Sequence, residues 1–284
     1  MSRIKIMVDS ISTIPWETAD ELGIELVPYY VNFEGESIRE DPSFDLKAFY
    51  KKLRQAKDWP GTSHPAPQDI EERFGRLSQE ADEIIYLMIP SQLTETYNIA
   101  HQLREKFKGV RIELCDVGSV LGKLGLVALE AYRLAEAGKT VDEIIDQVYS
   151  MSKRSRVFIT LETLKYLART GRIGKAAALL GTTLSIKPII TTQEGMIVPA
   201  GKTLTHNQAI NWVLKKIKSD LDKFNARKIK CFVNDVDNRK ISDLVRARLE
   251  KNFQCEEVWQ VEMSPLIATA TGPGTWAVSY LIVE

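Results

Sequence analysis

Short apolar runs alternate with amphipathic segments through the first half of this 284-residue chain. Compact apolar runs predict strands at residues 4–9, 25–33, 83–89 and 110–116. Apolar positions three and four residues apart predict helices at 45–56, 69–79, 94–107 and 125–138. Thr140 and Glu143 have capping-box spacing, so a further helix is expected from there to about residue 153. Strands that alternate with helices favour a mainly parallel sheet with helices on both faces.

The second half has a different pattern, because a hairpin stands among helix-linked strands. Residues 186–192 and 196–202 flank the turn residues 193–195 and are typical of a β-hairpin. Further strands are expected at 156–160, 228–235, 256–263 and 276–284, and helices at 161–170, 176–184, 206–224 and 239–252. The prediction is therefore an α/β protein of two tightly packed domains, a parallel one at 1–154 and a mixed one at 155–284.

Composition and charge exclude several classes of protein. Lys+Arg and Asp+Glu both number 38, and no basic block is present, so nucleic acid is not an expected partner. Neither a secretory signal nor a run of about 20 apolar residues appears, which predicts a cytoplasmic protein with no integral membrane segment. The three cysteines and three histidines lack metal-ligand spacing, so no metal and no cofactor are expected.

Two glycine patterns resemble nucleotide-binding motifs without matching them. Residues 195–203, GMIVPAGKT, place five residues between the glycines where a phosphate-binding loop needs four. Gly118, Gly122 and Gly125 have GxxxGxxG spacing, which favours close packing of a helix over dinucleotide binding.

Two hydroxyl-rich loops each precede a predicted helix. The first contains Thr62 and Ser63, and the second contains Ser91, Thr94 and Thr96. Hydroxyls beside the free N–H groups of a helix N-terminus can hold a carboxylate or a phosphate. The same residue types are preferred N-caps, so helix capping is the favoured interpretation of each loop taken alone.

A basic loop in the second half offers a third candidate. Arg169, Arg172 and Lys175 stand among glycines, where an arginine can hold a carboxylate or phosphoryl group through two hydrogen bonds. A solvated basic loop explains them as well. No acid or nucleophile has a motif relation to a histidine, so a small-molecule enzyme is the weakest reading and no catalytic residue is expected.

Taken together, the motifs resemble one family. VDSISTIP, TSHPAPQDI, LTETY, CDVGSVLGKLG, residues 161–190 and TGPG follow in the order seen in the DegV family of bacterial fatty-acid-binding proteins. The resemblance covers nearly the whole chain. It implies the fold called EDD, in which two α/β domains enclose a long-chain fatty acid, and a non-catalytic role as the lipid-presenting subunit of an ATP-dependent fatty acid kinase.

The resemblance also implies roles for individual residues. Thr62 and Thr94 would bind the fatty-acid carboxylate, and Arg172 and Ala270 would face the kinase. Hydroxyls close to these positions in the fold would support the head group: Ser63, Ser91, Thr96, Thr269 and Thr271. The acyl chain would supply most of the affinity, because burying each methylene gains roughly 0.8 kcal/mol.

Two positions depart from the family pattern. Glu95 stands where the family has glycine and would repel a bound anion if its side chain turned inward. Ala270 replaces the histidine that family members carry before the GPG turn. These departures leave open an alternative function, a lipid carrier or sensor that is no longer coupled to a kinase.

Overall fold

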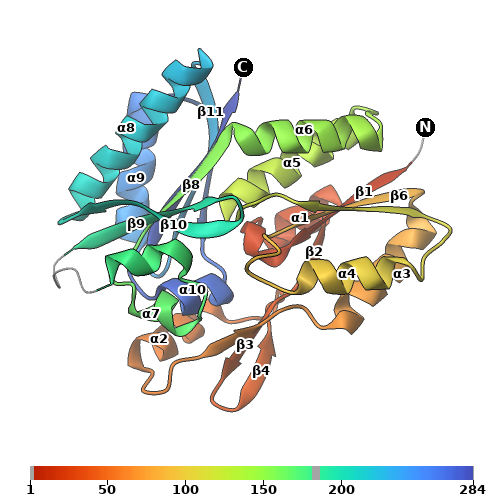
Figure 1. The fold of residues 1–284 in the computed structure, drawn as a ribbon, viewed down its shortest axis with the longest axis horizontal. Helices are drawn as coiled ribbons and strands as arrows, with labels where there is room; N and C mark the ends of the chain where they lie inside the picture. The colour runs from red at the N-terminus through yellow and green to blue at the C-terminus, as the bar shows by residue number, and fades with distance from the viewer. Residues whose placement is uncertain (1–2, 181–185, 284) are drawn as a thin grey trace.

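The computed structural model describes residues 3–180 and 186–283 and contains two larger sheets beside each other and one small one (Figure 1). Sheet A is four-stranded and parallel throughout. Its order is β2 (Glu25–Val27), β1 (Ile4–Asp9), β6 (Glu83–Met88) and β7 (Arg111–Asp116). The parallel pairing confirms the prediction for the first half of the chain.

Sheet C is six-stranded and mixed. Its order is β10 (Met196–Thr203), β9 (Lys187–Gln193), β8 (Ser155–Thr160), β13 (Trp276–Val283), β11 (Lys228–Asp235) and β12 (Gln254–Glu262). Only the pairing of β11 with β12 is parallel among its neighbouring strands. The predicted mixed α/β character of the second half is therefore confirmed, and so is the hairpin formed by β9 and β10.

The small sheet B consists of antiparallel strands from the first half of the chain. Its order is β4 (Glu36–Arg39), β3 (Tyr30–Phe33) and β5 (Gly61–Ser63). The predicted strand 25–33 is wrong as a single element, since Pro28 lies between β2 and β3 and the two belong to different sheets. Proline has no N–H for a ladder, which favours a break at this point.

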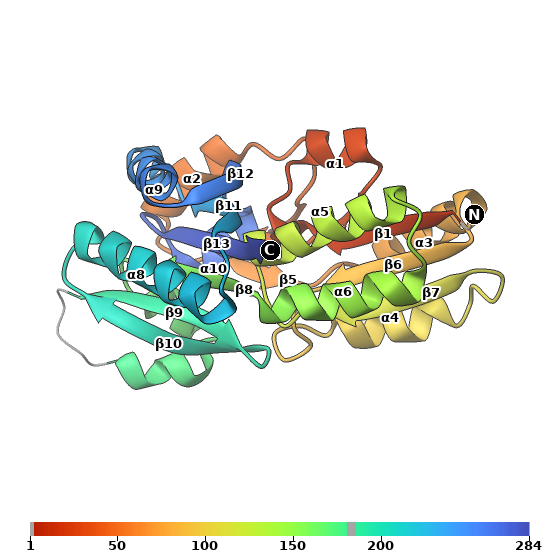
Figure 2. The same cartoon turned by 90° about the horizontal axis from the view of Figure 1, so that it is seen from above.

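Helices cover both large sheets (Figure 2). The helices of the first half are α1 (Trp16–Leu22), α2 (Leu46–Gln55), α3 (Pro67–Glu80), α4 (Thr96–Arg104), α5 (Gly122–Glu136) and α6 (Val141–Lys153), with the 3₁₀ helix η1 (Ser10–Ser12). In the second half they are α7 (Lys165–Arg169), the 3₁₀ helix η2 (Gly174–Leu179), α8 (His206–Phe224), α9 (Arg239–Asn252) and α10 (Pro265–Thr271). The helix expected at 176–184 is wrong over its described part, where η2 ends at Leu179 and Leu180 is extended. Residues 181–184 lie outside the described residues.

Local sequence signals explain where several helices begin and how closely they pack. Thr140 and Glu143 form both hydrogen bonds of a capping box at the start of α6, as predicted. A Cβ atom on Gly122 would lie 2.2 Å from Cβ of Phe232, and one on Gly125 would lie 2.5 Å from the Ser12 carbonyl oxygen. The interpretation that close helix packing needs glycine is confirmed for Gly122 and Gly125 and is wrong for Gly118, around which a Cβ atom would have open space.

Helix α5 connects the two halves. It packs against β1 of sheet A and against β11 and β13 of sheet C, and Figure 2 shows it extending beside both sheets. One hydrophobic cluster includes Leu87 of sheet A together with Ile159 and Ile190 of sheet C. Sheet A precedes residue 154 and sheet C follows it, but a domain boundary between residues 154 and 155 stays a prediction because the core is shared.

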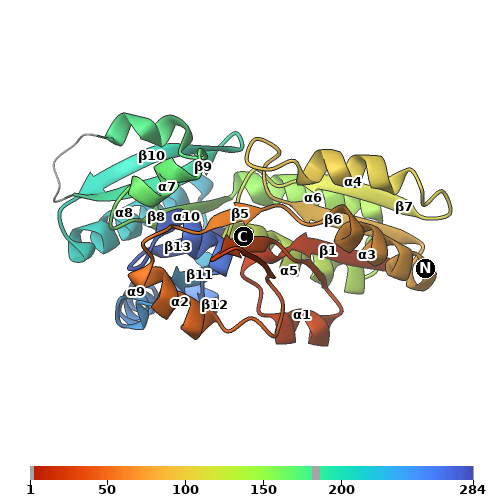
Figure 3. The same cartoon turned by 90° about the horizontal axis from the view of Figure 1, so that it is seen from below.

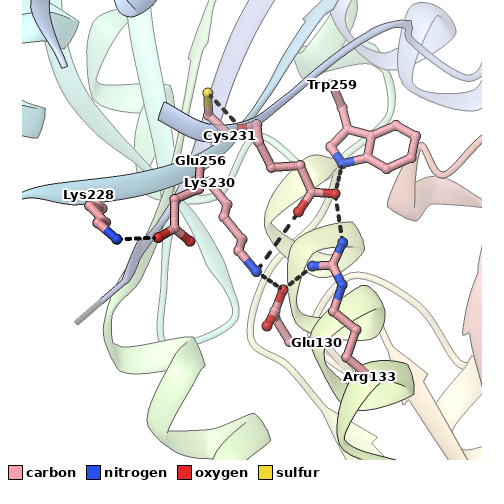
Figure 4. A network of polar contacts seen from close by, with 8 residues as sticks. Glu130, Arg133, Lys228, Lys230, Cys231, Glu256 and Trp259 are labelled. Carbon is pink, nitrogen blue, oxygen red and sulfur yellow. Dashed lines mark hydrogen bonds and ion pairs between the residues drawn. The ribbon is translucent and has the colours of Figure 1, made fainter. Parts of the chain in front are cut away.

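Polar side chains add a second connection between α5 and sheet C (Figure 4). Nζ of Lys230 on β11 lies 2.7 Å from Oε1 of Glu130, and Nη2 of Arg133 lies 2.8 Å from Oε1 of Glu257 on β12. The Trp259 indole donates to the same Glu257 oxygen at 2.7 Å. Hydrogen bonds and ion pairs therefore join α5 to β11 and β12 of sheet C.

Within residues 3–180 and 186–283, no helix is both long enough and apolar enough to cross a bilayer.

Candidate functional site

A cavity lies where the carboxyl ends of β1 and β6 meet sheet C. In sheet A, β2 lies next to β1 on one side, and β6 lies next to β1 on the other side. The direction in which strands are added to the sheet therefore reverses between β1 and β6. Ligands of open α/β sheets commonly bind at such a switch point, beyond the carboxyl ends of the strands. Asp9 ends β1 here, and Ile89 follows β6.

The cavity has a volume of about 240 Å³ and is mostly apolar. The loops that follow the strands of sheet A contribute Ile11, Ile89 and Val120 to its wall, and strands β8, β9 and β10 contribute Ile159, Ile190 and Ile197. Leu266 and Ile267 of α10 line it as well. Both halves of the chain therefore form the wall, which agrees with the expected position of a ligand between them.

Thr62 and Thr94, the two residues predicted to bind a carboxylate, both line this cavity. Thr62 lies on β5, where the backbone pairs with Val31 of β3, and its side chain is half-buried. Thr94 stands two residues before α4, and its Oγ1 lies 2.7 Å from the Thr96 hydroxyl. The fold thus brings together two hydroxyls that are 32 positions apart in the sequence.

Ser63 and Glu95 also line the cavity but have other partners. The Ser63 hydroxyl accepts a hydrogen bond from the Asn32 amide at 2.7 Å. The Glu95 carboxylate accepts one from the Asn98 amide at 2.8 Å, and its side chain is exposed. Of the two orientations considered for Glu95, the structure has the outward one, which keeps the carboxylate hydrated beside α4.

Three of the predicted supporting hydroxyls have structural hydrogen bonds and do not line the cavity. The Ser91 hydroxyl donates to Asp116 at 3.0 Å, and the Thr269 hydroxyl donates to the Pro265 carbonyl at 2.9 Å. Thr96 is fully buried and lies behind Thr94. Thr271 does line the cavity, although its hydroxyl donates to the Ile267 carbonyl at 2.8 Å.

Arg172 and Ala270, the two predicted kinase-facing residues, lie at the cavity as well. The exposed Arg172 guanidinium donates to the Thr170 carbonyl at 2.7 Å and to the Leu93 carbonyl at 3.5 Å. These bonds connect the loop after α7 with the loop that carries Thr94. Ala270 is half-buried on α10, so the position where the resemblance implies a histidine lies on the cavity wall.

Sequence reasoning missed two polar residues, Asp9 and Tyr29. Asp9 is fully buried and accepts hydrogen bonds from the Tyr86 hydroxyl at 2.6 Å, the Ile89 N–H at 2.8 Å and the Tyr29 hydroxyl at 3.3 Å. Burial raises the pKa of Asp9 to about 7, although these hydrogen bonds oppose the rise. An acidic residue directly after a buried apolar strand, as in IKIMVD, was the available signal.

The site has the chemistry of a binding pocket for an amphipathic anion. Apolar walls suit a hydrocarbon chain, and three residues with hydroxyl groups line the same cavity: Thr62 of β5, Thr94 of the loop before α4, and Tyr29. Hydroxyl donors can hold a carboxylate without a full opposing charge. In the described parts of the chain, no group of three or more His, Cys, Asp or Glu side chains could hold a metal ion.

The sequence matches one family model over residues 3–283, described as an uncharacterised protein of the DegV family. Among curated proteins, a DegV domain-containing protein of Clostridium perfringens is 31% identical over 282 residues, which cover 98% of each chain. The match spans nearly the full length of both chains.

Solved structures match equally completely. A fatty-acid-binding DegV family protein from Thermus thermophilus has a TM-score of 0.93 and 28% identity, covering 99% of this chain and 100% of that one. A DegV family protein from Eubacterium eligens, loaded with heptadecanoic acid, has a TM-score of 0.84 over 99% of this chain and 100% of that one. At 21% identity, the second likeness supports the fold alone.

Proposed function

Because the chain belongs to the DegV family, we propose that it binds a long-chain fatty acid in the cavity between sheets A and C. Thr62 and Thr94 donate hydrogen bonds to the carboxylate in this proposal, and the acyl chain contacts the apolar wall. The protein is a carrier and performs no catalysis on the lipid.

One observation supports the proposal most directly: the two threonines named from the sequence lie on one cavity that is otherwise mostly apolar. Each buried methylene contributes roughly 0.8 kcal/mol, so about fifteen of them contribute roughly 12 kcal/mol before ordering costs. The polar end needs only enough donors to replace the water lost by the carboxylate. The relative from Thermus thermophilus, which binds fatty acid, adds support because it matches the whole chain at 28% identity.

The direct test is to identify the lipid that copurifies with the protein. Denaturing extraction followed by mass spectrometry should release a long-chain fatty acid in an amount close to one per chain. A folded preparation that neither contains such an acid nor takes one up from a cyclodextrin complex would contradict the proposal.

The roles of the two threonines are tested by the double variant Thr62→Val and Thr94→Val. Valine keeps the shape and removes the donor, and a hydrogen bond to a charged group is worth about 1.5–3 kcal/mol. Fatty-acid affinity should therefore fall by at least about tenfold. Ser91→Ala is the matched control, since its hydroxyl belongs to the same loop but binds Asp116 instead of lining the cavity.

We further propose that a separate, ATP-dependent fatty acid kinase phosphorylates the presented carboxylate, which would place the chain in the cytoplasm. Arg172 is exposed at the cavity and suits a contact with such a partner. Ala270 favours the second candidate, a carrier or sensor without a kinase, because it supplies neither a proton nor a charge. The test mixes the lipid-loaded protein with the cognate kinase and ATP and measures acyl phosphate. Product from the wild type would support the kinase-coupled carrier. No product from the wild type, together with product from Ala270→His, would support the carrier or sensor without a kinase.

A further inference from the structure

An unbroken chain of hydroxyl contacts connects the cavity to the buried Asp9 carboxyl. Thr94 Oγ1 lies 2.7 Å from Thr96 Oγ1, and Thr96 Oγ1 lies 3.0 Å from the Tyr29 hydroxyl. The Tyr29 hydroxyl lies 3.3 Å from Asp9 Oδ2. Thr94 and Tyr29 line the cavity, whereas Thr96 and Asp9 are fully buried behind it.

Among the described residues, the other groups that face Asp9 include no cation. From β6, the Tyr86 hydroxyl donates to Oδ1 at 2.6 Å, and the Ile89 N–H that follows this strand donates to Oδ2 at 2.8 Å. Asp116, at the end of β7, adds repulsion between like charges. Burial is the largest cause of the rise in the pKa of Asp9 to about 7.

The protonation of Asp9 decides which way the hydroxyls point, because each hydroxyl has a single hydrogen to donate. An ionised Asp9 only accepts, so Tyr29 donates to it, Thr96 donates to Tyr29, and Thr94 donates inward to Thr96. Thr94 then presents a lone pair to the cavity. A protonated Asp9 donates to Tyr29, the order reverses, and Thr94 presents its hydrogen to the cavity.

We propose that Asp9 is a positioning residue that couples uptake of a proton to binding of an anionic head group through Tyr29, Thr96 and Thr94. The coupling rests on the proposed function, since the anion is the fatty-acid carboxylate. A carboxylate in the cavity needs the hydrogen of Thr94 and is repelled by a second buried negative charge, so both effects favour protonated Asp9. The affinity for the ligand is therefore high near neutral pH and falls as the pH rises.

The test measures the affinity for palmitate between pH 6 and 8.5, with palmitate delivered from a cyclodextrin complex so that it stays monomeric. An ordinary carboxyl group is ionised throughout this range, so the probe does not titrate. The dissociation constant of the wild type should rise by up to about tenfold per pH unit above pH 7. Hexadecan-1-ol has the same chain and no charge, and its dissociation constant should stay constant.

Two variants separate the hydroxyl chain from a general effect of pH. Asp9→Asn removes the titration, so palmitate affinity should become independent of pH. Thr96→Val interrupts the chain at a buried position outside the cavity wall. It should remove the part of the pH dependence that comes from hydroxyl orientation and keep only the part from charge repulsion, while both proteins keep a cooperative thermal transition. Retention of the full wild-type pH dependence by either folded variant would overturn the proposal.

Glu40 provides a matched control for burial of a carboxyl. It is buried, its pKa is raised to about 7 by burial, and its partners are Ser10 and Ser264 rather than the hydroxyls of the cavity. Glu40→Gln should therefore keep the wild-type pH profile of palmitate binding; a flattened profile would count against a relay specific to Asp9.

Palmitate binding by the wild type with a flat profile would overturn the relay alone, whereas no binding at any pH would overturn the proposed function and the relay with it.

Discussion

At the scale of single residues, Glu40 makes the stability of the protein depend on pH. The carboxyl is 6% exposed, and the Ser10 hydroxyl donates to it at 2.8 Å. Burial raises its pKa from 4.5 to about 7, so the folded state keeps a proton that the unfolded state has already released between these values. Stability that this residue contributes below pH 4.5 is therefore lost as the pH rises to about 7.

Glu40→Gln should remove this loss. The raised pKa corresponds to about 3 kcal/mol, because each tenfold change in proton affinity is worth about 1.4 kcal/mol. The free energy of unfolding of the variant, relative to that of the wild type, should increase by about this amount between pH 4.5 and 8. Urea titrations of both proteins at several pH values measure the difference. A constant difference across this range would show that Glu40 ionises normally in the folded state.

At the scale of elements, the turn after α10 is fixed by aromatic side chains from other elements. Gly272 ends α10 with a φ of 82°, and a Cβ atom there would lie 2.0 Å from Cδ2 of Tyr166. The Tyr166 ring stacks on Trp59 with centroids 4.1 Å apart, and the Trp59 indole donates to the Thr269 carbonyl at 2.8 Å. Figure 3 shows α7 and α10 close together, and α10 also contacts α2. The turn thus holds the helix that carries Ala270 and Thr271.

Gly272→Ala should destabilise the protein by about 2–4 kcal/mol, because strain at a positive φ adds to a clash with an aromatic ring. Gly118→Ala is the matched control, since Gly118 has a φ of 68° but open space around a Cβ atom, and should cost only about 1 kcal/mol. Thermal unfolding of the two variants separates strain from clash. Equal losses in both would mean that Tyr166 moves away without cost.

Elements with clear start and stop signals were predictable from the sequence. Short elements, and elements that depend on contacts with distant residues, were not. The bounds expected for α8, α9 and β11 match the structure, because amphipathic or apolar runs end there at polar residues. Helix α10 was missed, although Ser264 and Pro265 are an N-cap and a first-turn proline. Strand β5 has only three residues and depends on pairing with β3.

The candidate site shows the same division. Thr62 and Thr94 were each identified from a short, continuous sequence motif, and both line the cavity. The relay to Asp9 depends on contacts between residues up to 67 positions apart along its path, and no local pattern encodes such contacts. In the sequence, the Ser91 hydroxyl looked as suitable for binding a carboxylate as that of Thr94. Its contact with Asp116 directs it elsewhere, and the sequence does not reveal this contact.

At the scale of the whole molecule, the cavity requires the two halves to keep a fixed arrangement, and α5 provides part of it. The pair of Lys230 and Glu130 spans the halves, with side chains 15% and 20% exposed. Arg133 also contacts Glu257, and this bond lowers the pKa of Glu257 although burial opposes it. Removing one charge from such a group leaves a partner poorly solvated, which is more costly than losing an exposed ion pair.

A double-mutant cycle tests whether this network stabilises the arrangement of the halves. Lys230→Met should cost about 1–3 kcal/mol, and the double variant with Glu130→Gln should cost less than the sum of the single changes. The neighbouring pair Lys228 and Glu256 is the matched control, because it joins β11 to β12 within one half, at 2.9 Å and with side chains 41% and 31% exposed.

The same two substitutions at the control pair should each change the free energy of unfolding by less than about 1 kcal/mol, since solvent screens an exposed pair. Denaturant unfolding of all variants gives both coupling energies under identical conditions. A coupling energy at Lys230 and Glu130 no larger than at Lys228 and Glu256 would mean that apolar packing of α5 alone sets the arrangement of the halves. The larger coupling is expected because the side chains of the inner pair are less exposed than those of the control pair. Arg133, which also pairs with Glu130, and Glu257, 3.9 Å from Lys230, limit its size.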